Sequence, residues 1–177
     1  MTGILGAVLA GGRSSRFGSD KAVASLGHRS LAEHAAASIA PFVGDVVMIG
    51  ERIGGLGDLP RPDLGPLGGI AAALDHAAGR GYRCVLTIGC DMPVLPAGLI
   101  ETLLRRDPSF CADAPVLGLW PTALGAQLLA HIETGDDRSV RGWARSVGAI
   151  PVRSPAPLHN INTRADLAGL EREMMAL

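Results

Sequence analysis

The chain has 177 residues, of which 26 are Ala and 24 are Gly, and only 3% are aromatic. Its 47% hydrophobic and 19% charged residues exclude a disordered or collagen-like chain, and the length fits one globular domain, residues 1–177. With 16 Lys and Arg against 17 Asp and Glu, the net charge of −1 excludes a general electrostatic attraction to nucleic acid or an anionic membrane surface.

The cysteines and the first apolar run bear on the cell compartment. Cys84, Cys90 and Cys111 lack the close pairing of zinc and redox sites, and their odd number favours structural thiols in a reducing cytosol. Residues 4–10 follow no basic residue, which is atypical of a signal peptide, and no stretch approaches the roughly 20 apolar residues that span a bilayer. We therefore expect a cytoplasmic protein with neither a nucleic-acid nor a membrane partner.

The first half of the chain alternates short apolar runs with helical patterns. Ser30 and Glu33 form the capping-box pattern that opens a helix. Residues 50–69 contain seven Gly and three Pro and predict one extended loop. The elements expected in this half are strands at 3–10, 46–49 and 84–88 and helices at 31–40 and 70–78.

The second half has a weaker pattern. Asp136 or Asp137 is expected to cap a short helix, and Thr163 with Asp166 opens a C-terminal one. The elements expected here are helices at 96–106, 123–133 and 138–146 and strands near 110–116 and at 149–152. Alternating strands and helices predict an α/β fold with a mostly parallel sheet and helices on both faces.

The loop after the first strand is suited to a polyanion. Paired glycines at 11 and 12 allow a ligand to approach the backbone, and Arg13, Arg16 and Lys21 place three cations within nine residues. The segment is not a P-loop, because Lys21 follows Asp20, and it lacks the G-x-G-x-x-G spacing of dinucleotide-binding folds. A different kind of phosphate-binding loop is indicated.

Seven short motifs extend this pattern over nearly the whole chain. They are Leu9-Ala-Gly-Gly12, Arg16-Phe-Gly18, Asp20-Lys21, Gly65-Pro-Leu-Gly-Gly69, Cys90-Asp-Met-Pro93, Pro121-Thr-Ala123 and Asn160-Ile-Asn-Thr163. In order and approximate spacing the chain resembles the molybdenum cofactor guanylyltransferases, a MobA-like nucleotidyltransferase family. The resemblance implies a three-layer α/β/α, Rossmann-like fold of the nucleotide-diphospho-sugar transferase type, with a nucleotide-binding N-terminal half and an acceptor-binding C-terminal half.

The activity that the resemblance implies is Mg²⁺-dependent transfer of GMP from GTP to the phosphate of molybdopterin or its molybdenum-bearing form, with release of pyrophosphate. Transient contact with molybdoenzymes or their chaperones would follow. The attacking group is already an anionic phosphate oxygen, so the reaction needs no nucleophilic side chain. Its requirements are in-line positioning and cations that offset the repulsion between anions.

The resemblance also implies roles for individual residues. Arg16, Lys21 and Asp91 would be catalytic, with Asp91 also the Mg²⁺ ligand. The acceptor would be met by Asn160 and Asn162. The nucleotide would be held by Leu9, Ala10, Gly11, Gly12, Lys21, Asp63 and Asp91.

One further acceptor contact is expected from the segment before residue 146. Arg138 and Arg141 have the i,i+3 spacing of one helix face near a helix start, and Arg138 is our candidate for an acceptor contact. An exposed basic helix face explains the same spacing.

Each of the other site residues also has a purely structural interpretation. Asp91 could cap a turn, and Arg16 and Lys21 could be solvated surface charges. Residues 65–69 could form a tight turn, and the two asparagines could be turn formers.

Two alternative functions stay open. The family often places an Asn next to the guanine after the second strand, where this sequence has Ile49 and Gly50. A related enzyme that uses CTP or another nucleotide, on molybdopterin or on another small phosphorylated acceptor, is therefore the first alternative. A nucleotide-binding carrier or chaperone without transferase activity is the second.

Overall fold

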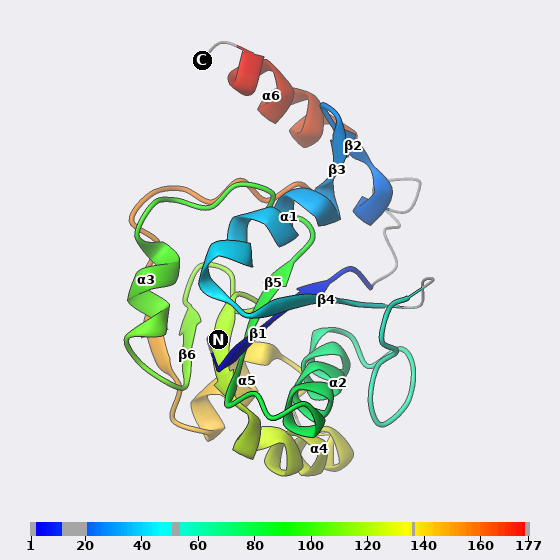
Figure 1. Ribbon diagram of the computed structural model, residues 1–177, viewed down its shortest axis with the longest axis vertical. Helices are drawn as coiled ribbons and strands as arrows, with labels where there is room; N and C mark the ends of the chain where they lie inside the picture. Colours follow the sequence, from blue (N-terminus) through cyan, green and yellow to red (C-terminus); the bar gives the residue numbers. More distant parts are fainter. Residues whose placement is uncertain (1–2, 12–20, 51–53, 136, 176–177) are drawn as a thin grey trace.

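A computed structural model describes residues 3–11, 21–50, 54–135 and 137–175. Within these ranges one six-stranded sheet crosses the centre of the molecule (Figure 1) in the order β4-β1-β5-β7-β6-β8. The strands are β1 (Ile4–Leu9), β4 (Asp45–Ile49), β5 (Cys84–Gly89), β6 (Ser109–Cys111), β7 (Gly118–Pro121) and β8 (Ile150–Val152). β7 runs antiparallel to both of its neighbours, while the other pairings are parallel, so the expected mostly parallel sheet is confirmed.

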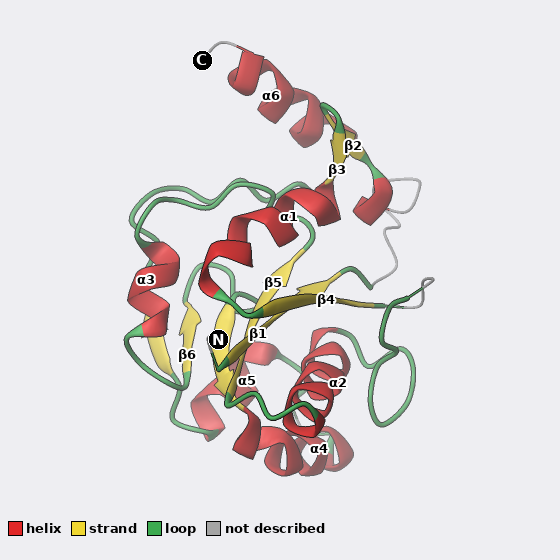
Figure 2. Ribbon diagram, viewed as in Figure 1, coloured by secondary structure: helices red, strands yellow, loops and turns green. Residues whose placement is uncertain are grey.

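Helices cover both faces of the sheet (Figure 2). On one face lie α1 (Leu31–Ile39) and α3 (Leu99–Leu104), and on the other lie α2 (Pro66–Gly79), α4 (Gly125–Thr134) and α5 (Val140–Ser146). Side chains of β1 alternate between the two cores, with Leu5, Ala7 and Leu9 in one and Val8 in the other. Burial on both faces explains why this strand reads as a continuous apolar run, and it confirms the three-layer α/β/α architecture.

The expected loop over residues 50–69 is wrong at its C-terminal end, because α2 begins at Pro66. Gly65 supplies a positive φ of 67° before the helix, and proline at the first helical position needs no backbone donor. A Cβ at Gly69 would lie 3.0 Å from Leu9 Cδ2 and 3.1 Å from Ile49 Cγ2. Glycine at position 69 therefore lets α2 pack closely on β1 and β4.

Three further expectations differ from the structure. The strand expected near 110–116 is limited to β6, the antiparallel strand β7 that follows it was not expected, and the helix expected at 96–106 is limited to α3. The cap of α5 is Ser139, whose hydroxyl accepts from Gly142 N at 2.9 Å. Asp137 accepts from Ser139 N instead, and Asp136 lies outside the described residues.

A third, small core stands apart from the sheet at one end of the molecule, where α6 (Arg164–Met175) lies beside a hairpin (Figure 1). Its buried residues are Leu26, Leu31, Ile161 and Leu170. The hairpin consists of β2 (Ser25–Leu26) and β3 (Arg29–Ser30). The remaining elements are the short 3₁₀ helices η1 (Lys21–Val23), η2 (Ala40–Phe42) and η3 (Thr122–Leu124).

Among the described helices, none has the length and apolar character required to cross a membrane. The cysteines at 84, 90 and 111 are buried, in agreement with structural thiols.

Candidate functional site

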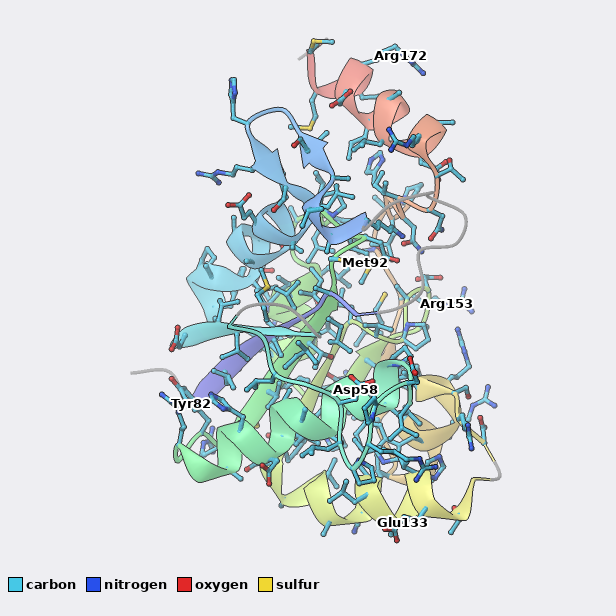
Figure 3. All side chains as sticks on the ribbon, turned by 90° about the vertical axis from the view of Figure 1, so that its right-hand side faces the viewer. Asp58, Tyr82, Met92, Glu133, Arg153 and Arg172 are labelled. Carbon is cyan, nitrogen blue, oxygen red and sulfur yellow. The ribbon has the colours of Figure 1, made fainter. Side chains whose placement is uncertain are left out.

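The carboxyl ends of β1, β4 and β5 meet at one edge of the sheet, which faces the viewer in Figure 3. Hydrogen bonds continue past the strands: Ala10 N donates to Ile49 O at 2.8 Å, and Cys90 N donates to Leu9 O at 3.1 Å. Met92, which follows Asp91, lies near the middle of this view. Ligands of open α/β sheets bind outside such an edge, so this is where the candidate site is built.

The backbone itself forms one part of the edge. Gly50 has a φ of 139°, and a Cβ there would lie 3.1 Å from Gly11 N and 3.3 Å from the carbonyl carbon of Ala10. The loops after β1 and β4 therefore touch through their backbones, and a side chain at position 50 would be strained. Leu9 and Ala10 are buried, as expected for residues that would offer only backbone groups to a ligand.

Two of the expected site residues, Gly12 and Arg16, lie outside the described residues. Lys21, Asp91 and Asn162 are described, and the fold brings them together from distant parts of the sequence. Lys21 Nζ lies 3.4 Å from Asp91 Oδ2 and donates to Asn162 Oδ1 at 3.1 Å. The Lys21 side chain is 13% exposed and that of Asp91 31%, so the ion pair is partly shielded from water. Lys21 is also the sole lysine of the sequence. A count of lysines does not by itself indicate that this residue is functional.

Asp91 is held in a tight turn at the end of β5. Met92 N donates to Gly89 O at 3.2 Å, and the backbone carbonyl of Asp91 accepts from Ile161 N at 2.9 Å. A Cβ at Gly89 would collide with Asp91 Oδ1. Glycine at the strand end therefore lets the carboxylate fold back over the edge of the sheet.

Asn162 comes from the turn that precedes α6. Asp166 Oδ2 accepts from Asn162 N at 2.9 Å and from Thr163 N at 2.7 Å, and Thr163 Oγ1 accepts from Asp166 N at 3.1 Å. These bonds confirm the expected capping box of Thr163 and Asp166. The amides of Asn162 and Thr163, in that order, lower the pKa of Asp166 below its ordinary value. The sequence pattern predicts the helix cap formed by Asp166 but not its hydrogen bond to Asn162.

Two other candidates with described side chains, Asn160 and Asp63, form no hydrogen bond with the side chains of this cluster. Asn160 is exposed and makes no side-chain hydrogen bond with the described residues. Asp63 is exposed and adopts a positive φ of 60° in the loop before α2. Asp58, labelled in Figure 3, packs over the first turn of α2, where a Cβ at Gly68 would lie 3.0 Å from its Cβ. No sequence motif had drawn attention to Asp58.

The proposed pairing of Arg138 and Arg141 on one helix face is wrong, because α5 begins only at Val140. Arg138 is an exposed loop residue. Arg141 Nη2 donates to Ala112 O, just after β6, at 2.7 Å. Of these two arginines, Arg141 is therefore the one that a hydrogen bond holds just after strand β6.

The donor set suits a small hard cation. Within the described residues no three His, Cys, Asp or Glu side chains gather to hold a metal ion. The Asp91 carboxylate and the Asn162 amide oxygen nevertheless hold the Lys21 ammonium between them, so the two oxygens already make a place for positive charge. Mg²⁺ prefers one or two carboxylates completed by phosphate oxygens and water, which this pair allows.

Comparisons with known proteins agree with these features. Residues 6–150 match the sequence profile of a family described as MobA-like NTP transferase domain. A molybdenum cofactor guanylyltransferase from Rhizobium leguminosarum bv. trifolii is 38% identical, over 98% of this chain and 94% of its own length. Another from Rhodobacter capsulatus is 36% identical over 95% of each chain. The resemblance seen in the sequence motifs is confirmed.

Solved structures bear on the fold. A molybdopterin-guanine dinucleotide biosynthesis protein A from Archaeoglobus fulgidus has a TM-score of 0.69 at 20% identity, over 98% of this chain and all of the other. A nucleotidyl transferase from Methanothermobacter has a TM-score of 0.74 at 14% identity, over 98% of both chains. At these identities the likeness concerns the fold alone, and it confirms the nucleotidyltransferase type of sheet and helix arrangement.

Proposed function

Because the chain belongs to the MobA-like NTP transferase family, we propose that it is a molybdenum cofactor guanylyltransferase. It transfers GMP from GTP to the terminal phosphate of molybdopterin or its molybdenum-bearing form. A phosphate oxygen of the acceptor forms a new bond to the α-phosphorus of GTP. The bond from that phosphorus to the oxygen that bridges to the β-phosphate breaks, and pyrophosphate leaves with the electron pair.

The observation that carries this proposal is the cluster of Lys21, Asp91 and Asn162 at the carboxyl edge of the sheet. No serine, cysteine or histidine is needed as a nucleophile, because the acceptor phosphate already attacks as an anion. The site has instead to align two anions and to stabilise the charge that develops on pyrophosphate. Lys21 would make its charge available to the phosphates, and Asn162 would orient Lys21 from the acceptor side.

Magnesium dependence is part of the proposal. Asp91 would hold Mg²⁺, with Asn162 close by, and Arg16 and Asn160 keep the phosphate and acceptor roles that the family resemblance implies. When bound, the ion would supply Lewis-acid stabilisation of phosphate charge. The other assigned contacts are also proposals: the backbone of residues 9–12 and Asp63 for the nucleotide, and Arg138 for the acceptor. We also propose that residues 1–177 form a single domain, in which the N-terminal half binds the nucleotide and the C-terminal half binds the acceptor.

The choice of base depends on the segment after β4. Gly50 packs against the backbone of Gly11 and Ala10, so this position offers no side chain to a base. The next described residues along the chain are those of the loop at 54–65, and its backbone groups would contact the base. Use of CTP or another nucleotide therefore stays as the second candidate function.

The decisive experiment supplies purified protein with Mg²⁺, molybdopterin and each of the four nucleoside triphosphates in turn. We expect pyrophosphate release and a product of the mass of the guanine dinucleotide with GTP alone. Transfer from CTP but not from GTP would overturn the guanylyltransferase assignment while leaving the family intact.

A non-catalytic carrier or chaperone makes a different prediction for the same assay. It predicts nucleotide binding without pyrophosphate release from any triphosphate, and binding that survives Asp91→Ala. We place the protein in the cytoplasm, with transient contact to the molybdoenzymes or chaperones that receive the product.

A further inference from the structure

The turn that carries Asn162 is anchored on one side by Ile161. The Ile161 side chain is 2% exposed and packs with Leu26, Leu31 and Leu170, and its backbone amide donates to Asp91 O at 2.9 Å. This anchor ties the turn to the end of β5. It does not by itself determine where the next side chain points, because φ and ψ of Asn162 stay adjustable.

A single carboxylate oxygen restrains those two angles. Asp166 Oδ2 accepts from Asn162 N at 2.9 Å and from Thr163 N at 2.7 Å. These amides belong to the two peptide planes that flank the Cα of Asn162, so one oxygen holds both planes. The Asn162 side chain then reaches Lys21 Nζ at 3.1 Å.

We infer that Asp166 is a positioning residue of the transfer site, which acts by fixing the backbone of Asn162 and through it the place of Lys21. This inference rests on the proposed function, since it assigns a role within the same site. Asp166 itself touches neither substrate nor metal in this scheme.

An ordinary helix cap does not explain the bond to Asn162. In the capping box of α1, Glu33 Oε2 accepts from Ser30 N at 2.6 Å and from Ser30 Oγ at 2.8 Å, all within the cap residue. The box of α6 needs only the bond to Thr163 N, so the bond to the preceding residue is additional. That additional bond is also the largest cause of the lowered pKa of Asp166, and the Lys21 ammonium contributes to the same shift.

The kinetic test compares Asp166→Ala with two matched controls. Thr163→Ala removes the other half of the same capping box, and Glu33→Gln weakens the box of α1, whose hydrogen bonds join only Ser30 and Glu33. Asp166→Ala should lower kcat for pyrophosphate release about 10-fold, as removal of a group that orients a ligand of the reacting centre does. The two controls should lower kcat less than about twofold, and Asp166→Asn, which keeps an acceptor oxygen, should recover most of the loss.

A double-mutant cycle separates positioning from mere stability. In an Asn162→Ala background the Asp166→Ala change should cost less than about twofold in kcat, because the group that it positions is already gone. An equal loss in both backgrounds would overturn the inference. So would losses in the two controls as large as that of Asp166→Ala.

A second readout does not depend on transferase activity. Because Lys21 is the sole lysine, acetylation by acetic anhydride, followed by mass spectrometry of the peptide, reports its reactivity directly. We expect Asp166→Ala to raise the acetylation rate about three- to tenfold by loosening the Asn162 contact, and Glu33→Gln to leave it unchanged. An unchanged rate in a folded Asp166→Ala protein would overturn the inference. If wild type transfers no nucleotide, the proposed function fails, and this measurement still decides the role of Asp166.

Discussion

The two sides of the candidate site are built differently. Asp91 follows β5, whose six residues are all buried between the two large cores. Asn162 stands on a turn held by Ile161, by the Asp166 carboxylate and by a small core that α6 shares with the β2–β3 hairpin. The sheet side inherits its rigidity from the main fold, while the turn side depends on a few local contacts. We therefore expect the sheet side to govern the chemical step and the turn side to govern alignment.

The largest effect is expected at the sheet side. Asp91→Asn should lower kcat about 100- to 1,000-fold, because the carboxylate proposed to hold Mg²⁺ loses its charge, while nucleotide affinity stays nearly unchanged. Steady-state pyrophosphate release and titration calorimetry would measure both quantities. Asp75→Asn, an exposed carboxylate on α2, is the control. A rate for Asp91→Asn close to wild type would remove Asp91 from the site.

The next effect concerns the residue shared by both sides. Lys21→Ala removes a charge-assisted hydrogen-bond donor, and we expect kcat/KM for the triphosphate to fall about 10- to 100-fold. Lys21→Arg keeps the charge but not the compact ammonium, and should lie between wild type and Lys21→Ala. If Lys21→Ala retains full kcat/KM, the ion pair with Asp91 contributes nothing to the reaction, and the two sides of the site are not coupled.

A smaller effect isolates the geometry of the sheet side. Gly89→Ala places a methyl group where the Asp91 carboxylate lies, so that carboxylate has to rotate away. Because only the end of a side chain moves, the melting temperature should change little, while kcat falls about tenfold from misplacement. Gly79→Ala, which meets nothing within 4 Å, is the matched control. A large fall in melting temperature without a fall in kcat would contradict this interpretation.

The smallest effect is expected in the capping box of α1, whose hydrogen bonds join only Ser30 and Glu33. The Ser30 backbone amide, followed by its hydroxyl, holds the pKa of Glu33 below the ordinary value. A lowered folded-state pKa stabilises the protein above the unfolded-state pKa and loses that contribution as the pH falls below about 4. Denaturant titrations should therefore show Glu33→Gln slightly less stable than wild type at pH 7, with the gap narrowing at pH 3. An equal gap at both pH values would show that the carboxylate charge contributes nothing there.

The elements that depend on neighbouring residues alone were predicted correctly from the sequence. The apolar runs of β1, β4 and β5 are long enough to identify strands, and both capping boxes were recognised from residue type and spacing. The predictions were wrong where tertiary packing overrides the preferences of neighbouring residues. The glycines at 68 and 69 suggested a loop but lie in the first turn of α2, where the absence of a side chain at Gly69 permits contact with two strands. The strand expected near 110–116 was too long and β7 was missed, because strands of three and four residues leave too little periodicity to place them.

The candidate site also contains residues that the sequence predicted and contacts that only the structure shows. Asp91 was identified from the resemblance of its motif, Cys90-Asp-Met-Pro93, to that of the family, and Lys21 from the same resemblance together with a cluster of cations beside glycines. The sequence by itself thus determined the α/β class and the family resemblance, and it predicted a phosphate-binding first loop. Only the tertiary structure decided that Lys21 meets Asn162 across 141 residues and that Asp166 fixes the turn between them. The physical reason is that strand and helix propensities act over a few neighbouring residues, whereas a contact between distant segments exists only after both have packed on a common core.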